Sequence, residues 1–338
     1  MTTYSMFGII GNGSWATALA KMLTDNGNTI HWWMRNEDSV SHLLQKHHNP
    51  HYLTSVSFRP DLILPTTHLE QVTEACDTLV ICVPSAYILD VLDTLPAEAL
   101  QRKTIVSAIK GILPQQHILL NDYLVSAFAV PLQQYVAITG PCHAEEVAQE
   151  RLSYLTFSGL DDGVTQKAAA AFSTDYIRTT SNHDLWGAQY AAVLKNIYAV
   201  GAGLAHGIGY GDNFLSVYNT NCYREMYRFL QQQFEQVHPS SEIPDFHTSA
   251  YLGDLLVTCY SPHSRNRSFG TLVGKGYSVK AATTEMSMVA EGYFAVRGMR
   301  KIAAELNIDM PIMQQIHEVL WENRSPAAAF RNIETLLS

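Results

Sequence analysis

The residue of this chain best placed to do chemistry is Lys195, which precedes Asn196 inside the apolar run 191–200. A lysine surrounded by alanine, valine, leucine and isoleucine is partly desolvated, which favours its neutral form and lowers its pKa. A neutral amine can take a proton from a hydroxyl group, so Lys195 is a candidate general base. The alternative is a helical lysine whose stem packs on apolar neighbours while its ammonium reaches water.

A second polar cluster, Ser264-Arg265-Asn266, follows a helical segment that begins near Asp254. Arginine makes bidentate, charge-assisted hydrogen bonds to phosphate, and serine and asparagine add further donors. The cluster therefore predicts a phosphate site, and Asp254 could orient the lysine or a substrate hydroxyl. A helix cap with surface arginines would have the same sequence, and Asp254 could equally cap a helix.

Near the start of the chain, a glycine-rich turn connects an apolar run to a helix-forming run. Gly11 allows a tight turn, Gly13 lets the backbone approach a phosphate, and Ala16 permits close packing of helix on strand. The free amides and the positive dipole end of the following helix would face the anion. This context predicts a dinucleotide site, and the alternative is an ordinary strand–turn–helix unit.

The second expected strand ends at Arg35, a position that helps to select between NAD and NADP. Arg35 can pair with the 2′-phosphate of NADP, whereas Glu37 or Asp38 could hold the ribose hydroxyl of NAD. The sequence leaves both cofactors open. Taken alone, Arg35 is also explained as a solvated surface charge.

These candidate residues must be positioned by regular elements, and strand and helix patterns alternate through the first half of the chain. The alternation predicts an α/β fold with a doubly wound sheet and right-handed crossovers. The expected strands are residues 6–10, 29–34, 78–83, 104–108 and 135–139. In such sheets ligands bind beyond the carboxyl ends of the strands. Arg35, Ser85, Lys110 and residues 140–144 all follow strand ends, so we expect them to share one crevice.

From about residue 184 the pattern changes. A long alanine-rich helical run, residues 185–204, is followed by a glycine-rich loop and further helical segments. Two domains are expected for 338 residues, because cores usually stop growing at about 250–300 residues. We therefore predict a Rossmann-type NAD(P)-binding domain over residues 1–189 and an all-helical substrate-binding domain over residues 190–338.

Composition and charge disfavour several other classes of protein. The formal net charge of −9 argues against a nucleic-acid partner, which needs a basic face. No apolar run reaches the roughly 20 residues of a membrane helix, and the first strand begins too early for a signal peptide. Five scattered cysteines without metal or redox spacing fit a reduced, cytoplasmic compartment. The histidine-rich piece 47–51 lacks ligands of other types, so no metal is expected.

Taken together, the residues resemble those of the bacterial NAD(P)-dependent sn-glycerol-3-phosphate dehydrogenases over most of the chain. Each motif is common by itself, but their order and spacing are specific. The matching stretches are Gly11-x-Gly13-Ser-Trp-Ala-Thr-Ala-Leu-Ala, Val83-Pro-Ser85, Lys110-Gly111, Gly140-Pro-x-x-Ala144-Glu-Glu, Leu194-Lys195-Asn196, Gly211-Asp-Asn213, Gly253-Asp-Leu, Ser264-Arg-Asn-Arg267-x-Phe-Gly270 and Val289-x-Glu291-Gly292.

The resemblance implies reversible conversion of sn-glycerol 3-phosphate to dihydroxyacetone phosphate, running in cells toward glycerol 3-phosphate for glycerophospholipid synthesis. It implies a homodimer, Lys195 as the proton acceptor and Lys110 as a catalytic residue between cofactor and substrate. The cofactor contacts that it implies are Gly11, Gly13, Ser14, Trp15, Arg35, Lys110, Ala144, Arg265, Val289 and Glu291. The substrate contacts that it implies are Lys110, Gly140, Cys142, Lys195, Asp254, Ser264, Arg265 and Asn266.

Three positions depart from the family pattern. Cys142 stands where Ser or Thr is common, His143 replaces a residue that is usually Phe, and Asn221 replaces an Arg. Neither Lys195 nor Lys110 is among them, so the expected activity stands and only flanking contacts are open.

Two other functions stay open at this point. A β-hydroxyacid dehydrogenase would share the glycine-rich turn and the Lys-Asn pair, but the 264–266 cluster favours a phosphate substrate. A protein that senses NAD(P)H without turnover would need neither Lys110 nor Lys195, and both are present.

Overall fold

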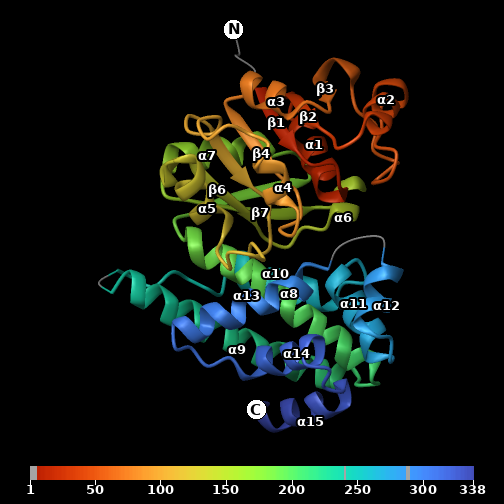
Figure 1. Ribbon diagram of the computed structural model, residues 1–338, viewed down its shortest axis with the longest axis vertical. Helices are drawn as coiled ribbons and strands as arrows, with labels where there is room; N and C mark the ends of the chain where they lie inside the picture. Colours follow the sequence, from red (N-terminus) through yellow and green to blue (C-terminus); the bar gives the residue numbers. More distant parts are fainter. Residues whose placement is uncertain (1–5, 240, 287–289) are drawn as a thin grey trace. The chain divides into compact units, whose positions relative to one another are not determined.

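The computed structural model describes residues 6–239, 241–286 and 290–338 (Figure 1). The chain folds as two compact units. The first unit runs to Ile109 and takes in Leu120–Leu185, and the second consists of Lys110–Leu119 and Trp186–Ser338. The short segment Lys110–Leu119 therefore groups with the C-terminal part of the chain, although it directly follows a strand region of the first unit.

An eight-stranded sheet forms the centre of the first unit, in the order β3-β2-β1-β4-β5-β6-β7-β8. Neighbouring strands run parallel except for β6 and β7. The order of β1 to β6 is the one typical of dinucleotide-binding sheets, which confirms the predicted Rossmann-type fold. The strands are β1 (Met6–Ile10), β2 (Thr29–Trp33), β3 (Ile63–Thr66), β4 (Thr78–Ile81), β5 (Thr104–Ser107), β6 (Tyr135–Thr139), β7 (Ser153–Gly159) and β8 (Ile177–Asn182).

Helices pack on both faces of this sheet, because successive residues of a strand point to opposite faces. On one face Phe7 of β1 and Phe157 of β7 contact Phe172 of α7, with ring centroids 6.3 and 5.5 Å apart. On the other face, a β-carbon at Gly8 would stand 2.7 Å from Val72 of α3. The helices are α1 (Ser14–Asp25), α2 (Glu37–Lys46), η1 (Pro60–Leu62), α3 (Leu69–Ala75), α4 (Ile88–Leu92), α5 (Leu120–Phe128), η2 (Leu132–Gln134), α6 (Ala144–Ala148) and α7 (Asp162–Phe172).

The second unit is helical throughout its described regular elements. They are α8 (Leu185–Gly207), α9 (Asp212–Val237), a π-helical turn η3 (Ser249–Gly253), α10 (Asp254–Tyr260), α11 (Arg265–Gly274), α12 (Val279–Glu285), α13 (Glu291–Glu305), α14 (Pro311–Trp321) and α15 (Pro326–Leu336). This arrangement confirms the predicted all-helical C-terminal region. The segment 238–247, for which an exposed loop fits the sequence, has no helix or strand in its described residues.

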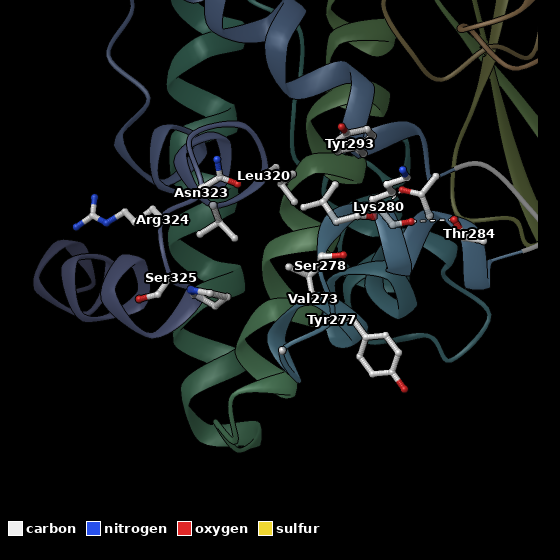
Figure 2. Close-up of a pocket in the computed structure, with 15 residues that line it drawn as sticks. Val273, Tyr277, Ser278, Lys280, Thr284, Tyr293, Leu320, Asn323, Arg324 and Ser325 are labelled. Atoms are coloured by element: carbon white, nitrogen blue, oxygen red, sulfur yellow. Dashed lines mark hydrogen bonds between the residues drawn. The ribbon is translucent and has the colours of Figure 1, made fainter.

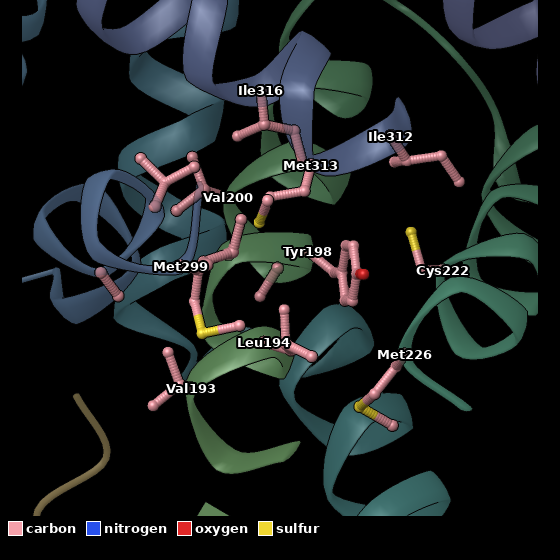
Figure 3. Close-up of a cluster of buried hydrophobic side chains, with 14 of the residues drawn as sticks. Val193, Leu194, Tyr198, Val200, Cys222, Met226, Met299, Ile312, Met313 and Ile316 are labelled. Atoms are coloured by element: carbon pink, nitrogen blue, oxygen red, sulfur yellow. The ribbon is translucent and has the colours of Figure 1, made fainter. Parts of the chain in front are cut away.

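The core of the second unit forms around α8, whose residues 191–205 are all buried. A helix that is apolar on every side is typical of the middle of a core. Figure 3 shows Leu194 and Tyr198 of α8 among methionines of α9, α13 and α14. The helix that carries Lys195 is thus held by packing from several directions, which fixes where that lysine can stand.

Candidate active site

Lys195 lies on α8 with only 5% of its surface exposed, and its Nζ donates a hydrogen bond to the carboxylate of Asp254. Asp254 is the first residue of α10 and is also buried. The lysine therefore does not reach solvent as a surface lysine would. The pKa of Lys195 is lowered to about 8, because burial and the charge of Lys110 outweigh the opposing charge of Asp254. An amine with such a pKa can exchange protons near neutral pH.

Lys110 belongs to the same helical unit as Lys195. Its carbonyl oxygen accepts a hydrogen bond of 3.0 Å from the Nδ2 atom of Asn196, the residue next to Lys195. The main chain of the Lys110 segment is thus tied to α8. The two lysines are close enough for the charge of one to affect the titration of the other.

The polar cluster at the start of α11 has three different environments. Ser264 caps the helix, its Oγ accepting from the amide of Arg267, while Arg265 is exposed. Asn266 is buried; its Nδ2 donates to the Oδ1 of Asn196 at 2.9 Å, and its Oδ1 accepts from the amide of Gly292 at 2.9 Å. The start of α11 therefore has the helix cap that was the alternative to a phosphate site, and it also has an exposed arginine.

Asn196 connects three segments that bear predicted site residues, although no role was predicted for Asn196 itself. Its side chain bonds the Lys110 carbonyl and Asn266, and Asn266 in turn bonds Gly292 at the start of α13. Glu291, the first residue of α13, is half-buried beside this network, and position 289 lies outside the described residues. A buried asparagine in an apolar helical run was the available sequence signal, since buried polar groups need partners.

In the first unit, the turn after β1 leaves open space in front of the first amides of α1. Gly11 has a φ of +124°, and a β-carbon there would stand 2.5 Å from the carbonyl oxygen of Cys82. Gly13 directly precedes α1 as its N-cap residue, and a β-carbon there would meet no atom within 4 Å. No side chain caps this helix and its first turn has no acidic residue, so its amides suit an anion. Ser14 is buried and Trp15 half-buried in the first turn of α1.

The other predicted cofactor and substrate residues of the first unit also follow the carboxyl ends of parallel strands. Arg35 is exposed between β2 and α2. Gly140 follows β6 with a φ of +111°, Cys142 is buried, and Ala144 is the first residue of α6. These residues lie at the same sheet edge as the glycine-rich turn. The predicted site residues thus form two groups, one in each unit.

Asn49 supports the glycine-rich turn, although no sequence pattern predicted such a role for it. It is fully buried, and its Nδ2 donates to the carbonyl oxygen of Asn12 at 3.1 Å and to Oγ1 of Thr17 at 2.9 Å. Its Oδ1 accepts from the amides of His51 and Tyr52. The histidine-rich piece is therefore built around an asparagine that holds the turn. Across residues 6–239, 241–286 and 290–338, no group of three His, Cys, Asp or Glu side chains could hold a metal ion.

The helical unit also has a cavity of about 700 Å³, which is shown in Figure 2. Its walls come from α11 to α15 and include Tyr277, Lys280, Tyr293 and Arg324. The predicted site residues that the structure describes are not among those that line it. Among the same described residues, no helix is both long and apolar enough to cross a membrane.

Comparisons with known proteins match nearly the whole chain to one family. Residues 7–164 match the model for the N-terminus of NAD-dependent glycerol-3-phosphate dehydrogenase, and residues 184–331 match the model for its C-terminus. The chain is 34% identical to glycerol-3-phosphate dehydrogenase [NAD(P)+] of Lacticaseibacillus paracasei over 322 residues, covering 93% of this chain and 90% of that protein. The chain is 32% identical to the same enzyme of Pseudomonas savastanoi pv. phaseolicola over 325 residues, covering 96% of this chain and 92% of that protein.

A solved structure agrees with these sequence matches. The crystal structure of glycerol-3-phosphate dehydrogenase from Coxiella burnetii superposes with a TM-score of 0.88 at 26% identity, covering 97% of this chain and 98% of that one. Both units of the chain therefore have counterparts in one kind of protein.

Proposed function

The chain belongs to the family of NAD-dependent glycerol-3-phosphate dehydrogenases, and from this premise we propose how its own residues perform the reaction. The protein is an NAD(P)-dependent oxidoreductase that acts on a CH–OH group. It interconverts sn-glycerol 3-phosphate and dihydroxyacetone phosphate. In the oxidative direction the C2 hydroxyl loses a proton and the C2 carbon loses a hydride.

The residues of the first unit suit a dinucleotide. The uncapped amides of α1 and the open space beside Gly13 would hold the pyrophosphate, with Gly11, Ser14 and Trp15 around it. Arg35 at the end of β2 and Ala144 at the start of α6 would make further contacts, and NAD and NADP both stay open. The bound nicotinamide supplies the hydride acceptor or donor. Val289 and Glu291 are proposed cofactor contacts from the C-terminal part of the chain.

Proton transfer is assigned to Lys195. Its lowered pKa gives it both protonation states near neutral pH, so it can take the hydroxyl proton in oxidation and return it in reduction. Asp254 holds the amine in place through their hydrogen bond. Lys110 would stabilise the negative charge that develops on the C2 oxygen, the kind of fixed charge that contributes most to many enzymatic rates.

Substrate positioning is assigned to the start of α11. Arg265 is exposed and can bind the substrate phosphate through two hydrogen bonds, beside Ser264 and Asn266. Arg265 and Lys110 would contact cofactor and substrate alike. Gly140 and Cys142 are proposed to contact the substrate from the first unit. A phosphate fixed in this way places the C2 carbon for transfer, which can remove several kcal/mol from the barrier.

The observation that carries the proposal is the buried Lys195–Asp254 pair, on a helix whose Asn196 also bonds Asn266. The test is oxidation of NADH and of NADPH, followed at 340 nm, with purified protein and dihydroxyacetone phosphate. Loss of signal that requires this substrate supports the proposal, and the two rates give the cofactor preference. Turnover on small keto acids alone would favour a β-hydroxyacid dehydrogenase instead.

A Lys195→Ala variant separates the enzyme from a sensor of NAD(P)H. The variant should still bind NADH, which quenching of protein fluorescence measures, but should lose turnover. Turnover equal to that of the unmodified protein would remove Lys195 from the mechanism.

The cellular setting belongs to the same proposal. We place the protein in the cytoplasm, acting as a homodimer on a small-molecule substrate without a nucleic-acid partner, and supplying glycerol 3-phosphate for glycerophospholipid synthesis. The acidic net charge of −9 and the reduced state of all five cysteines are consistent with this setting. Light scattering coupled to size-exclusion chromatography tests the dimer.

A further inference from the structure

Helices α8 and α11 run side by side in the same direction, and their register stays constant along the contact. Residues on both helices meet at intervals of four, close to one helical turn. The opposed pairs are Asn196 with Asn266, Val200 with Gly270, and Leu204 with Gly274. The two helices that carry Lys195 and Arg265 therefore form one continuous contact.

Glycines make this contact very close. A β-carbon on Gly270 would stand 2.0 Å from the carbonyl oxygen of Val200, and one on Gly203 would stand 2.0 Å from that of Arg267. Carbon and carbonyl oxygen normally approach only to about 3.3 Å. No residue with a side chain fits at either position unless the helices separate.

These glycines are costly in themselves. Glycine inside a helix destabilises it by roughly 0.5–1 kcal/mol relative to alanine. Yet α8 contains Gly201, Gly203 and Gly207 within its C-terminal half. Gly203 and Gly207 offset this cost by allowing the close approach of α8 to α11.

Gly292, at the start of α13, makes another close approach to α8. A β-carbon on Gly292 would stand 2.4 Å from the carbonyl oxygen of Asn196, and its amide donates to Asn266. Gly292 therefore brings α13 against the residue that follows Lys195, and it bonds the residue that follows Arg265.

We propose that Gly203, Gly270 and Gly292 are positioning residues for the reaction, because they fix the distance between the amine of Lys195 and the phosphate-binding start of α11. The inference rests on the proposed function, which assigns proton transfer to Lys195 and phosphate binding to Arg265. The substrate must reach both groups at once. A rigid spacing between the two helices therefore determines whether phosphate and C2 oxygen are seated together.

The expected effect follows from the distances. A methyl group at position 270 forces α11 away from α8 by about 1 Å, the difference between the 2.0 Å approach and an ordinary contact. The hydrogen bond from Asn266 to Asn196, 2.9 Å long, then stretches to the limit of hydrogen-bond distance or beyond it. A misplacement of about 1 Å at a catalytic site costs on the order of 100-fold in rate.

The test is steady-state kinetics of full-length Gly270→Ala with dihydroxyacetone phosphate, expressed per NADH-binding site. We expect KM to rise and kcat to fall, with kcat/KM about 100-fold lower. The matched control is Gly274→Ala at the far end of the contact, where a β-carbon would stand 2.5 Å from the carbonyl oxygen of Leu204. It should lose thermal stability but keep KM and kcat within threefold, as roughly expected for a site away from the chemistry.

Different results would overturn the inference. A purely structural role lowers the amount of folded enzyme and leaves KM and kcat per binding site unchanged in both variants. Equal kinetic losses in both variants would also contradict it. If Gly270→Ala does not fold, Gly292→Ala in the first turn of α13 decides, with the same expected rise in KM. Failure of the unmodified protein to turn over dihydroxyacetone phosphate would instead reject the proposed function.

Discussion

At the scale of single residues, the pKa of Lys195 predicts opposite pH dependences for the two directions of the reaction. Oxidation needs the neutral amine, so kcat/KM for glycerol 3-phosphate should rise roughly tenfold per pH unit and level off near pH 8. Reduction needs the protonated amine, so kcat/KM for dihydroxyacetone phosphate should fall above pH 8. Initial rates at 340 nm from pH 6 to 10 measure both. Lys195→Arg stays protonated over this range, so kcat/KM for glycerol 3-phosphate should no longer level off near pH 8. An unchanged pH profile in this variant would assign the titration to another group.

The second prediction at this scale concerns Arg265. Its exposed side chain should contribute to substrate binding but little to the stability of the fold. Arg265→Ala should raise KM for dihydroxyacetone phosphate by on the order of 100-fold, the loss of about 3 kcal/mol in charged hydrogen bonds. The melting temperature should hardly change, since the side chain is exposed. Kinetics with dihydroxyacetone phosphate and a titration with NADH alone measure the two effects. Equal weakening of both ligands would place the phosphate elsewhere.

The sequence was informative about residues whose surroundings are local and uninformative about residues with distant partners. The apolar neighbours of Lys195 in the chain predicted its burial, and the structure has it buried. The partner of Lys195 could not be chosen, because Asp254 had several possible roles and lies 59 residues away. Asn196 was signalled only by its place in an apolar run and Asn49 not at all, since their hydrogen-bond partners come together only when the chain folds.

At the scale of elements, the loop after α2 is predicted to control cofactor affinity through Asn49. Asn49→Ala removes both hydrogen bonds that its Nδ2 donates and leaves the partly buried carbonyl of Asn12 without that partner, which costs about 1–3 kcal/mol. We expect NADH to bind several-fold more weakly and the melting temperature to drop. Asn49→Asp is the control, because its carboxylate can still accept from the amides of His51 and Tyr52.

The two Asn49 variants distinguish the turn from the loop. Both lose the donors to the glycine-rich turn, so both should bind NADH more weakly in a fluorescence titration. Weakening in the alanine variant alone would mean that the loop 49–52, and not the turn, sets the affinity. Unchanged affinity in both would remove Asn49 from the cofactor site.

Strands that are buried runs of mostly apolar residues were predicted most accurately. The strands expected at 6–10 and 135–139 have those bounds in β1 and β6, both runs of mostly buried residues. Three strands were not predicted. β3 contains Pro65 and β8 is largely polar, and both are sheet-edge strands, where proline and exposed residues are tolerated. β7 is also mostly buried, but its buried residues include Ser153, Thr156 and Ser158, so it is not an apolar run.

The helix expected over 185–204 continues to Gly207. Glycine is a poor helix former, so the sequence favoured an earlier end. Close packing against α11 explains the extension, because residues 203 and 207 both approach its backbone. A local preference was outweighed by a contact between distant segments.

At the scale of the whole molecule, a second buried titratable group makes stability depend on pH. Glu225 of α9 accepts hydrogen bonds from the amides of Ile312 and Met313 at the start of α14 and from the hydroxyl of Tyr198. Its pKa is raised to about 7, because burial outweighs the opposing effect of those donors. The folded state then binds more protons than the unfolded state between pH 4.5 and about 7, so stability falls as pH rises through that window. For Lys195, whose folded pKa of about 8 lies below its ordinary 10.5, stability rises with pH across the interval between them.

These two groups together predict a minimum in their contribution to stability between about pH 7 and 8, the range in which Lys195 is proposed to exchange protons. Glu225→Gln mimics the protonated acid. In this variant the fall in stability that Glu225 causes between pH 4.5 and about 7 should be absent. Relative to the variant, the unmodified protein should lose on the order of 3 kcal/mol of unfolding free energy between pH 4.5 and 7.5. Urea unfolding followed by circular dichroism at several pH values measures the difference, which cancels the carboxylates common to both proteins. A difference that does not change with pH would mean that Glu225 stays ionised throughout, with the two amides and Tyr198 fully offsetting its burial.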